Sequence, residues 1–287
     1  MINNGMKNLN IGCVAHCETV NDAWEYWYNE LCKQSERGFI SESRDGQVAG
    51  EFINAITIID DPTRNLVTSP LRKMPMRYAV GELLWYLSGS NKLQGIQNFT
   101  SAWDRMSDDG EHVNSGYGHK IQHFYGFDQY EHVKKLLQVD PLSRQAIIHI
   151  KNASDEPSKD TPCTISLQLL IRDNKLHMTA YMRSNDVWMG VPYDMFAFTC
   201  LQMKMAMELE VGIGTYTHIA GSLHLYDRYL PKLEKEFHTQ PKKKQPPKDE
   251  SSDCGTDEDW TKELQSKNLQ YSYDEFQGSK PPKVGEK

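Results

Sequence analysis

The spacing of apolar residues divides this chain into helical and strand-like segments. Apolar residues recur every three or four positions in the segments predicted as helices, which are 20–37, 76–87, 194–210 and 222–236. β-branched residues and alternating polarity predict strands over 47–59, 145–151, 164–172, 175–182 and 215–220. Helices and strands do not alternate strictly, so the sequence predicts an α+β fold with a large mixed β-sheet packed by helices.

Turn residues and biased composition mark the boundaries of these segments. Asp173-Asn174 is predicted to join two strands as a hairpin, and the turn residues of 110–118 indicate a loop. Residues 239–259 are rich in Pro, Lys and acidic residues, which predicts a flexible charged loop that buries no core. The sequence thus predicts one main domain over 1–238, then this loop. Residues 260–287 are interpreted as a C-terminal segment of the same domain that could close over a site as a tail.

Charge and cysteine content narrow the classes of function. The formal net charge is −7 over 287 residues, which argues against direct DNA binding through a basic face. The cysteines lack paired CxxC spacing, so neither a metal site nor a disulfide framework is predicted. No apolar run is long enough to span a membrane, and the first residues lack the apolar core of a signal peptide. The sequence therefore predicts a cytoplasmic protein with no membrane partner.

Cys163 is the first residue with candidate chemistry. It follows Pro162 at the start of a predicted strand, and Arg183 ends the partner strand of the same hairpin. A cation near a thiol lowers its pKa and increases the fraction of thiolate, which is the attacking form. Buried cysteines are more often small apolar core residues, so Cys163 alone leaves both interpretations open.

Polar residues at turns and in one apolar helix form a second candidate group. Arg44, Arg144 and Arg183, with Ser184, would make a forked phosphate receptor if the fold brings them together. Taken singly, each arginine is more often a surface residue. Glu82 lies in the strongly apolar helix 76–87, where a carboxylate without a partner is costly.

Eight short stretches stand in a fixed order: Gly81–Gly89, Trp103-Asp104, Gly116–Gly118, Asp140–Arg144, Pro162-Cys163, Arg183–Asp186, Gly190–Asp194 and Gly221–Tyr226. In order and spacing they resemble the thymidylate synthase superfamily from about residue 20 to the mid-230s. The resemblance implies a thymidylate synthase-like fold with a catalytic domain over 1–238, in which one sheet face forms a homodimer interface. It also implies a transferase that uses 5,10-methylenetetrahydrofolate as co-substrate, a pyrimidine nucleoside monophosphate as substrate, and no metal.

The resemblance implies a role for each matching residue. Cys163 matches the nucleophile that adds to C6 of the pyrimidine, and Glu82 matches the glutamate that organises proton transfer. Arg44, Arg183 and Ser184 match residues that bind the phosphate, and Arg144 matches an arginine that binds it from the other subunit. His224 and Tyr226 match residues that form hydrogen bonds to the sugar, and Tyr117 matches a residue that lines the catalytic cavity. Trp103 and Asp186 match residues that contact folate, and Asp186 also matches one near the reacting base.

Asp194 departs from the synthase pattern at the position that contacts the pyrimidine edge. Thymidylate synthases hold an asparagine there, whereas deoxycytidylate hydroxymethylases hold an aspartate. An ionised carboxylate only accepts hydrogen bonds, so it matches the 4-amino group of cytosine and opposes O4 of uracil. An unpaired buried polar group costs about 1–3 kcal/mol, which predicts a preference for cytosine of roughly tenfold to several hundredfold.

Further departures complete the subfamily comparison. Thr164 and Met182 stand where synthases usually hold histidine and glutamine, and both resemble the hydroxymethylase pattern. Gln145 replaces the second arginine of the usual phosphate-binding pair, whereas Val191–Tyr193 is synthase-like. The sequence therefore combines features of both subfamilies.

The sequence as a whole predicts an enzyme that converts dCMP, methylenetetrahydrofolate and water to 5-hydroxymethyl-dCMP and tetrahydrofolate, a product typical of phage DNA modification. Thymidylate synthase, dUMP hydroxymethylase and CMP hydroxymethylase remain open alternatives, since no residue decides the 2′ position of the sugar. A catalytically inactive regulator that binds nucleotides or mRNA is disfavoured, because Cys163, Glu82 and the phosphate arginines are intact.

Overall fold

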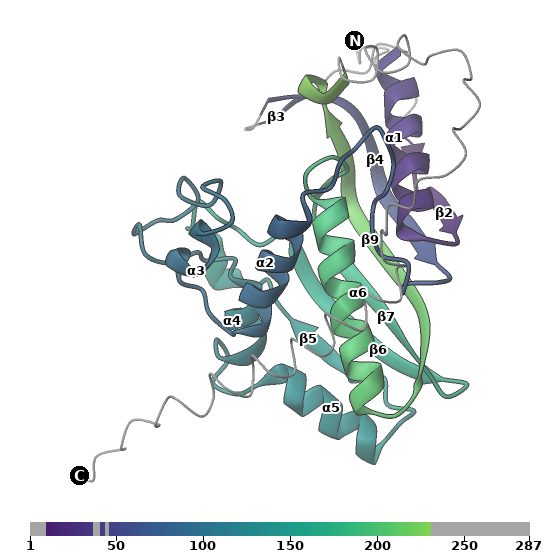
Figure 1. The fold of residues 1–287 in the computed structure, drawn as a ribbon, viewed down its shortest axis with the longest axis vertical. Coiled ribbons are helices and arrows are strands. Elements are labelled where there is room, and N and C mark those ends of the chain that lie inside the picture. Colours follow the sequence, from purple (N-terminus) through teal and green to yellow (C-terminus); the bar gives the residue numbers. More distant parts are fainter. Residues whose placement is uncertain (1–9, 37–40, 44–45, 231–287) are drawn as a thin grey trace, which may run out of the picture. The chain divides into compact units, whose positions relative to one another are not determined.

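A mixed sheet organises the part of the chain that the computed structural model describes, residues 10–36, 41–43 and 46–230 (Figure 1). Its main path runs β1-β4-β9-β7-β6-β5, while β2 and β3 also pair with β4, and β8 pairs with β9. The strands are β1 (Asn10–Ile11), β2 (Val14–Cys17), β3 (Ser41–Ser43), β4 (Gly46–Ile59), β5 (Ile147–His149), β6 (Thr164–Arg172), β7 (Lys175–Met182), β8 (Asn185–Asp186) and β9 (Gly212–Tyr226). The predicted α+β fold around a large mixed sheet is confirmed.

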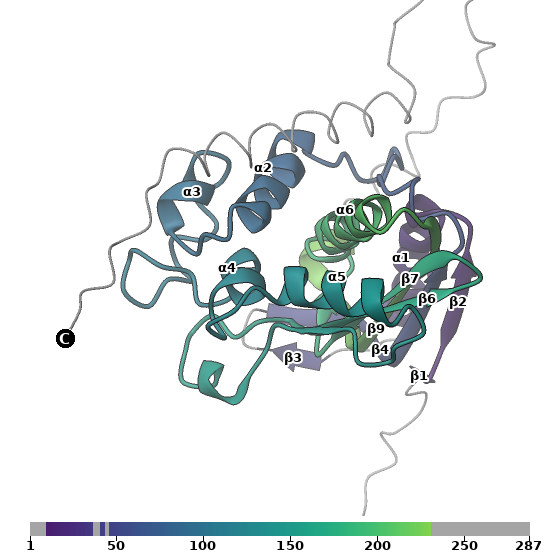
Figure 2. The ribbon, with the colours of Figure 1, turned by 90° about the horizontal axis from the view of Figure 1, so that it is seen from below.

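Helices cover one face of this sheet, as Figure 2 shows for α1, α2 and α6. The helices are α1 (Val20–Glu36), α2 (Met76–Leu87), α3 (Leu93–Gln97), α4 (Tyr117–Gln122), α5 (Gln129–Val139) and α6 (Val191–Glu208), with short 3₁₀ turns at Ala153–Asp155 and Asp227–Tyr229. Burial alternates along β7, where Leu176, Met178, Ala180 and Met182 are buried and the residues between them are not. The other face of the sheet is therefore half-exposed in this single chain.

The sequence of α6 explains its central position. Its side chains are apolar around most of the helix, and 13 of its 18 residues are buried, as expected for a helix enclosed on several sides. Pro192 lies in the first turn, where its missing N–H costs no helical hydrogen bond. The helix thus starts sharply after Gly190, and this start places Asp194 at its N-terminal end.

Several predicted elements coincide with the structure, and one is wrong. Segments 76–87, 164–172 and 175–182 match α2, β6 and β7. The helix predicted over 222–236 is wrong over its first residues, because β9 continues to Tyr226. Those residues find strand partners on β4, where Glu51 pairs with His224, and on β8.

The remaining predictions concern one loop and the segments outside the described residues. The loop predicted over 110–118 holds until Tyr117, where α4 begins. Arg44 and the segments 239–259 and 260–287 lie outside the described residues. Within the described ranges, no helix is both long enough and apolar enough to cross a lipid bilayer.

Candidate active site

The open end of the β6–β7 hairpin holds the candidate nucleophile. Cys163 directly precedes β6, Arg183 directly follows β7, and the backbone N–H of Arg183 donates to the carbonyl of Cys163 at 2.8 Å. Cys163 is half-buried and forms no disulfide. This backbone hydrogen bond thus holds Cys163 and Arg183 opposite each other at the open end of the hairpin.

The guanidinium of Arg183 is anchored to the loop that leads to this thiol. Its Nε donates to the carbonyl of Pro162 at 3.0 Å, and one Nη donates to the carbonyl of Thr161 at 2.8 Å. A guanidinium has five N–H donors, so donors remain for an anionic ligand. The side chain is exposed, which keeps these donors accessible.

Tyr117 contacts the residue that follows the thiol. Its hydroxyl accepts a hydrogen bond from the backbone N–H of Thr164 at 3.2 Å. The hydroxyl of Thr164 in turn donates to the sulfur of Met182 at 3.2 Å, across a register pair of β6 and β7. Thr164 and Met182, the two residues that depart from the synthase pattern, therefore contact each other next to Cys163.

Glu82 lies on α2 between two tyrosines, Tyr78 and Tyr86, one helical turn away on either side. The hydroxyl of Tyr78 donates to Glu82 Oε1 at 2.8 Å and accepts from Trp103 Nε1 at 3.3 Å. Burial, with a contribution from the negative charge of Asp194, raises the pKa of Glu82 to about 8, and the two tyrosine hydroxyls oppose the shift. Glu82 can therefore exchange a proton near neutral pH.

Asp194 lies beside Asn185 at the start of α6. Asn185 Nδ2 donates to Asp194 Oδ2 at 2.6 Å. Burial raises the pKa of Asp194 to about 7, and the hydrogen bond from Asn185 opposes the shift. The electrostatic interaction of Asp194 with Glu82, Tyr86 and Tyr117 places its carboxyl among the other candidate residues.

The β8–β9 ladder brings the next candidates into register. Asp186 pairs with His224, and one oxygen of Asp186 accepts from the backbone N–H of Trp188 at 2.8 Å. Burial raises the pKa of Asp186, while the N–H of Trp188 and the nearby His224 oppose the shift. The rings of His224 and Tyr226 meet edge to face at 5.0 Å, and both are largely buried.

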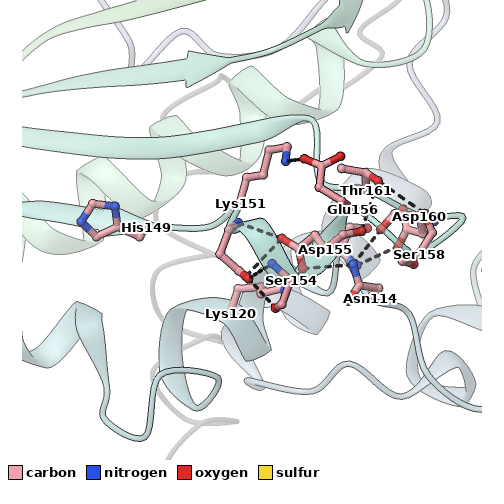
Figure 3. A network of polar contacts seen from close by, with 12 residues as sticks. Asn114, Lys120, His149, Lys151, Ser154, Asp155, Glu156, Ser158, Asp160 and Thr161 are labelled. Carbon is pink, nitrogen blue, oxygen red and sulfur yellow. Dashed lines mark hydrogen bonds and ion pairs between the residues drawn. The ribbon is translucent and has the colours of Figure 1, made fainter.

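A polar network anchors the loop before Cys163 to the start of α4 (Figure 3). At its centre Lys120 forms an ion pair with Asp155, and each side chain is 1% exposed. Asn114 Nδ2 donates to Asp155 Oδ1 at 3.2 Å and to the carbonyl of Asp160 at 2.9 Å. The hydroxyl of Thr161 donates to the carbonyl of Asp155 at 3.4 Å. The network and Arg183 thus hold this loop from two sides.

The structure gathers most of the predicted residues but not all of them. Ser184 is half-buried between Arg183 and Asn185. Arg144 is exposed just before β5, and no side-chain hydrogen bond or ion pair joins it to the described site residues. Arg44 lies outside those residues.

Sequence reasoning missed Asn185, Tyr78 and the Lys120–Asp155 pair. The spacing of Tyr78, Glu82 and Tyr86 at four-residue intervals does indicate one helical face. The other contacts join residues that are far apart in the sequence or lie on different elements, so no local pattern predicts them.

The assembled side chains suit nucleophilic and acid–base chemistry. Cys163 and Arg183 are joined across the hairpin, the buried Glu82 has a pKa of about 8, and the half-buried Asp194 has a pKa of about 7. Among the described residues there is no cluster of three or more His, Cys, Asp or Glu side chains that could hold a metal ion.

Comparison with known proteins shows which family this chain matches. The family described as Thymidylate synthase matches residues 26–261 of this chain. The crystal structure of thymidylate synthase from T4 phage covers 75% of this chain and 82% of its own, with a TM-score of 0.62 and 21% sequence identity. At that identity, the structural similarity shows a shared fold.

Proposed function

This chain belongs to the thymidylate synthase family, and from that premise we propose that it is a deoxycytidylate 5-hydroxymethyltransferase. The family implies an enzyme that transfers a one-carbon group and uses methylenetetrahydrofolate as co-substrate. The observation that carries the finer proposal is Asp194, a carboxyl group among the candidate catalytic residues where the resemblance places the pyrimidine edge. In its ionised form Asp194 accepts a hydrogen bond from the 4-amino group of cytosine.

The proposed reaction begins at Cys163. Its thiolate adds to C6 of dCMP, and the electron pair released to C5 forms a bond to the methylene carbon supplied by the co-substrate. Loss of the C5 proton and of tetrahydrofolate leaves an exocyclic methylene group. Water adds to that group, and the thiolate leaves C6 to give 5-hydroxymethyl-dCMP. Glu82, Tyr117 and Asp186 are proposed to position the water and move protons.

The phosphate of the substrate is assigned to Arg183 and Ser184, together with Arg44 and a second subunit's Arg144. Arg183 supports this assignment because it is exposed and retains free donors beside the thiol. Arg144 is exposed, and no side-chain hydrogen bond or ion pair joins it to the described site residues, as expected for a residue that acts in a partner's site. The half-exposed sheet face is the proposed homodimer interface. His224 and Tyr226 are proposed to bind the sugar.

The residues proposed to contact folate fit that ligand chemically. Trp103 offers a half-buried aromatic ring, and its Nε1 donates to Tyr78, which leads to Glu82. A carboxylate has about four acceptor positions, so Asp186 keeps acceptor capacity for the N–H groups of a pterin ring after binding Trp188. When bound, the co-substrate would supply the one-carbon group next to Glu82.

The test is turnover of dCMP, CMP and dUMP with methylenetetrahydrofolate, with mass spectrometry of each product. We expect 5-hydroxymethyl-dCMP, tetrahydrofolate rather than dihydrofolate, and a preference for dCMP over dUMP of roughly tenfold to several hundredfold. Cys163→Ala should abolish turnover and retain nucleotide binding. Formation of dihydrofolate, or equal turnover of dUMP and dCMP, would contradict the proposal.

One observation favours a second candidate, methylation or hydroxymethylation of dUMP. Because the pKa of Asp194 is raised to about 7, a fraction of this side chain is protonated at neutral pH and can donate to O4 of uracil. This candidate requires dUMP turnover to rise relative to dCMP turnover as the pH falls below 7. A dUMP-to-dCMP ratio that stays constant as the pH falls below 7 would contradict it.

A further inference from the structure

Asn185 is held rigidly next to the residue that is proposed to read the base. It lies on β8, paired with Leu223 of β9, and is 3% exposed. Its Nδ2 donates to Asp194 Oδ2 at 2.6 Å, a short hydrogen bond of the kind formed to charged acceptors. Strand pairing fixes the backbone of Asn185, and this bond orients its side-chain amide.

The orientation of the Asn185 amide follows the carboxylate. Its Oδ1 is buried and has no hydrogen-bond partner among the described residues. Leaving a buried acceptor unpaired is unfavourable. Turning the amide over would place Oδ1 against an oxygen of Asp194, which is repulsive when Asp194 is ionised. The observed orientation therefore leaves Oδ1 unpaired, and the hydrogen bond from Nδ2 to Asp194 offsets this cost.

The backbone around Asn185 makes room for this arrangement. A Cβ atom on Gly190 would lie 3.2 Å from Asn185 Oδ1 and 3.3 Å from its Cγ, closer than most side chains tolerate. Glycine at this position keeps the space that the amide occupies. Gly190 also precedes α6, and its carbonyl accepts from the N–H of Asp194 at 3.0 Å.

The other groups that face Asp194 do not favour its ionised form. The titratable groups that interact with it are Glu82 and Tyr86 on α2, Tyr117 on α4 and Tyr216 on β9. Glu82 is acidic and the three phenols are neutral at physiological pH. Within the described residues, the Asp194 side chain accepts one hydrogen bond, which comes from Asn185.

We propose that Asn185 is a specificity-determining residue that acts through Asp194. Its Nδ2 holds Oδ2 of the carboxylate in place and favours the ionised form, so that Oδ1 remains as an acceptor for the 4-amino group of a cytosine nucleotide. This inference rests on the proposed function, because it concerns how the same site distinguishes cytosine from uracil.

The test compares Asn185→Leu with the wild type in kcat/KM for dCMP and for dUMP, measured across pH. A hydrogen bond to a charged group contributes about 1.5–3 kcal/mol, so the dCMP-to-dUMP ratio should fall roughly tenfold to a hundredfold. The pH at which the ratio reaches half its maximum should move upward. Asn65→Leu is the matched control, since Asn65 is 6% exposed and donates to Thr199 of the same helix; its ratio should equal that of the wild type.

A double-mutant cycle separates positioning from a general loss of structure. In an Asp194→Asn background there is no carboxylate to orient, so adding Asn185→Leu should leave the ratio unchanged. An equal loss in both backgrounds would overturn the inference, as would an unchanged ratio in a folded Asn185→Leu protein. If Asn185→Leu does not fold, Asn185→Ser takes its place in the same cycle. A wild-type enzyme without preference for dCMP would instead refute the proposed function.

Discussion

Two buried acidic sites in this molecule differ in how their charge is balanced. Asp155 is 1% exposed and has a cation, Lys120, and the N–H donors of Asn114 and Asn152 around it. Glu82 is 5% exposed, its hydrogen-bond partners among the described residues are tyrosine hydroxyls, and another carboxyl group, Asp194, lies nearby. The first site lies beneath the loop that leads to the candidate nucleophile, and the second lies among the candidate catalytic residues.

The comparison shows how one fold uses buried carboxyl groups in two ways. A buried ion pair with satisfied hydrogen bonds fixes the positions of the elements it joins, although its net stabilisation is small. A buried carboxyl group without a cation prefers its protonated form, which raises its pKa towards neutral pH. The pKa values of about 8 for Glu82 and about 7 for Asp194 follow from this lack of compensation.

The uncompensated site has a consequence for stability. Because both pKa values are raised in the folded protein, the folded state holds more protons than the unfolded state between about pH 4 and pH 8. The contribution of these groups to stability is fully present below their unfolded pKa values. It is lost as the pH rises through about 7 and about 8.

Replacing Glu82 with glutamine should give the largest effect. Glu82→Gln removes the proton exchange and should lower kcat about 10²–10⁴-fold. It also removes the carboxyl group whose ionisation is unfavourable, so the free energy of unfolding at pH 9 should rise relative to the wild type. Turnover and denaturant unfolding of the same preparation measure the two effects. A kcat within threefold of the wild type would remove Glu82 from the proposed mechanism.

Breaking the compensated pair should act on stability in the opposite direction. Lys120→Met leaves Asp155 buried without its cation and should lower the free energy of unfolding by about 3–5 kcal/mol. A double variant, Lys120→Met with Asp155→Leu, should recover part of this loss, because no charge remains unpaired while Asn114 and Asn152 lose an acceptor. Denaturant unfolding at constant pH measures both.

The matched control for this pair is Lys151→Met. Lys151 forms an ion pair with Glu156, whose side chain is 66% exposed, in the same loop. Exposed ion pairs contribute at most about 1 kcal/mol, so Lys151→Met should unfold close to the wild type. A loss for Lys151→Met as large as that for Lys120→Met would show that loop packing, rather than burial of the ion pair, dominates.

The sequence predicted the parts of this fold and site that depend on local pattern. The apolar segment 76–87 and the β6–β7 hairpin have clear periodicity and a turn signal, so α2, β6 and β7 were predictable. That hairpin alone places Cys163 next to Arg183. The resemblance to a family identified the remaining candidates without showing their contacts.

The sequence did not predict the features that depend on long-range contacts. β9 extends to Tyr226 because β4 and β8 supply its hydrogen-bond partners. The local spacing of apolar residues there favours a helix, so the sequence alone predicted the wrong element. The Lys120–Asp155 pair joins positions 35 residues apart. The Asn185–Asp194 bond joins a strand to a helix across a turn, and periodicity within either element does not predict it.

The smallest effect is expected from removing a tyrosine hydroxyl that lowers the pKa of Glu82. Tyr78→Phe removes the hydroxyl that donates to Glu82 Oε1 and that lowers the pKa of this carboxyl group. The pKa of Glu82 should therefore move further upward, and the kinetic pKa assigned to it should rise in the pH profile of kcat. The lost hydrogen bond corresponds to about 1.5 kcal/mol, or roughly a tenfold change in kcat.

Tyr130→Phe is the control for this variant, since Tyr130 donates to Glu208, outside the candidate site, at 3.1 Å. Both variants remove one hydroxyl that is bound to a carboxylate, but only Tyr78→Phe should shift the pH profile. A profile that moves downward in Tyr78→Phe would mean that this hydroxyl stabilises the protonated form of Glu82. Tyr78 would then add to the effect of burial on the pKa of Glu82 instead of opposing it, and the contrast with the compensated Lys120–Asp155 site would be larger.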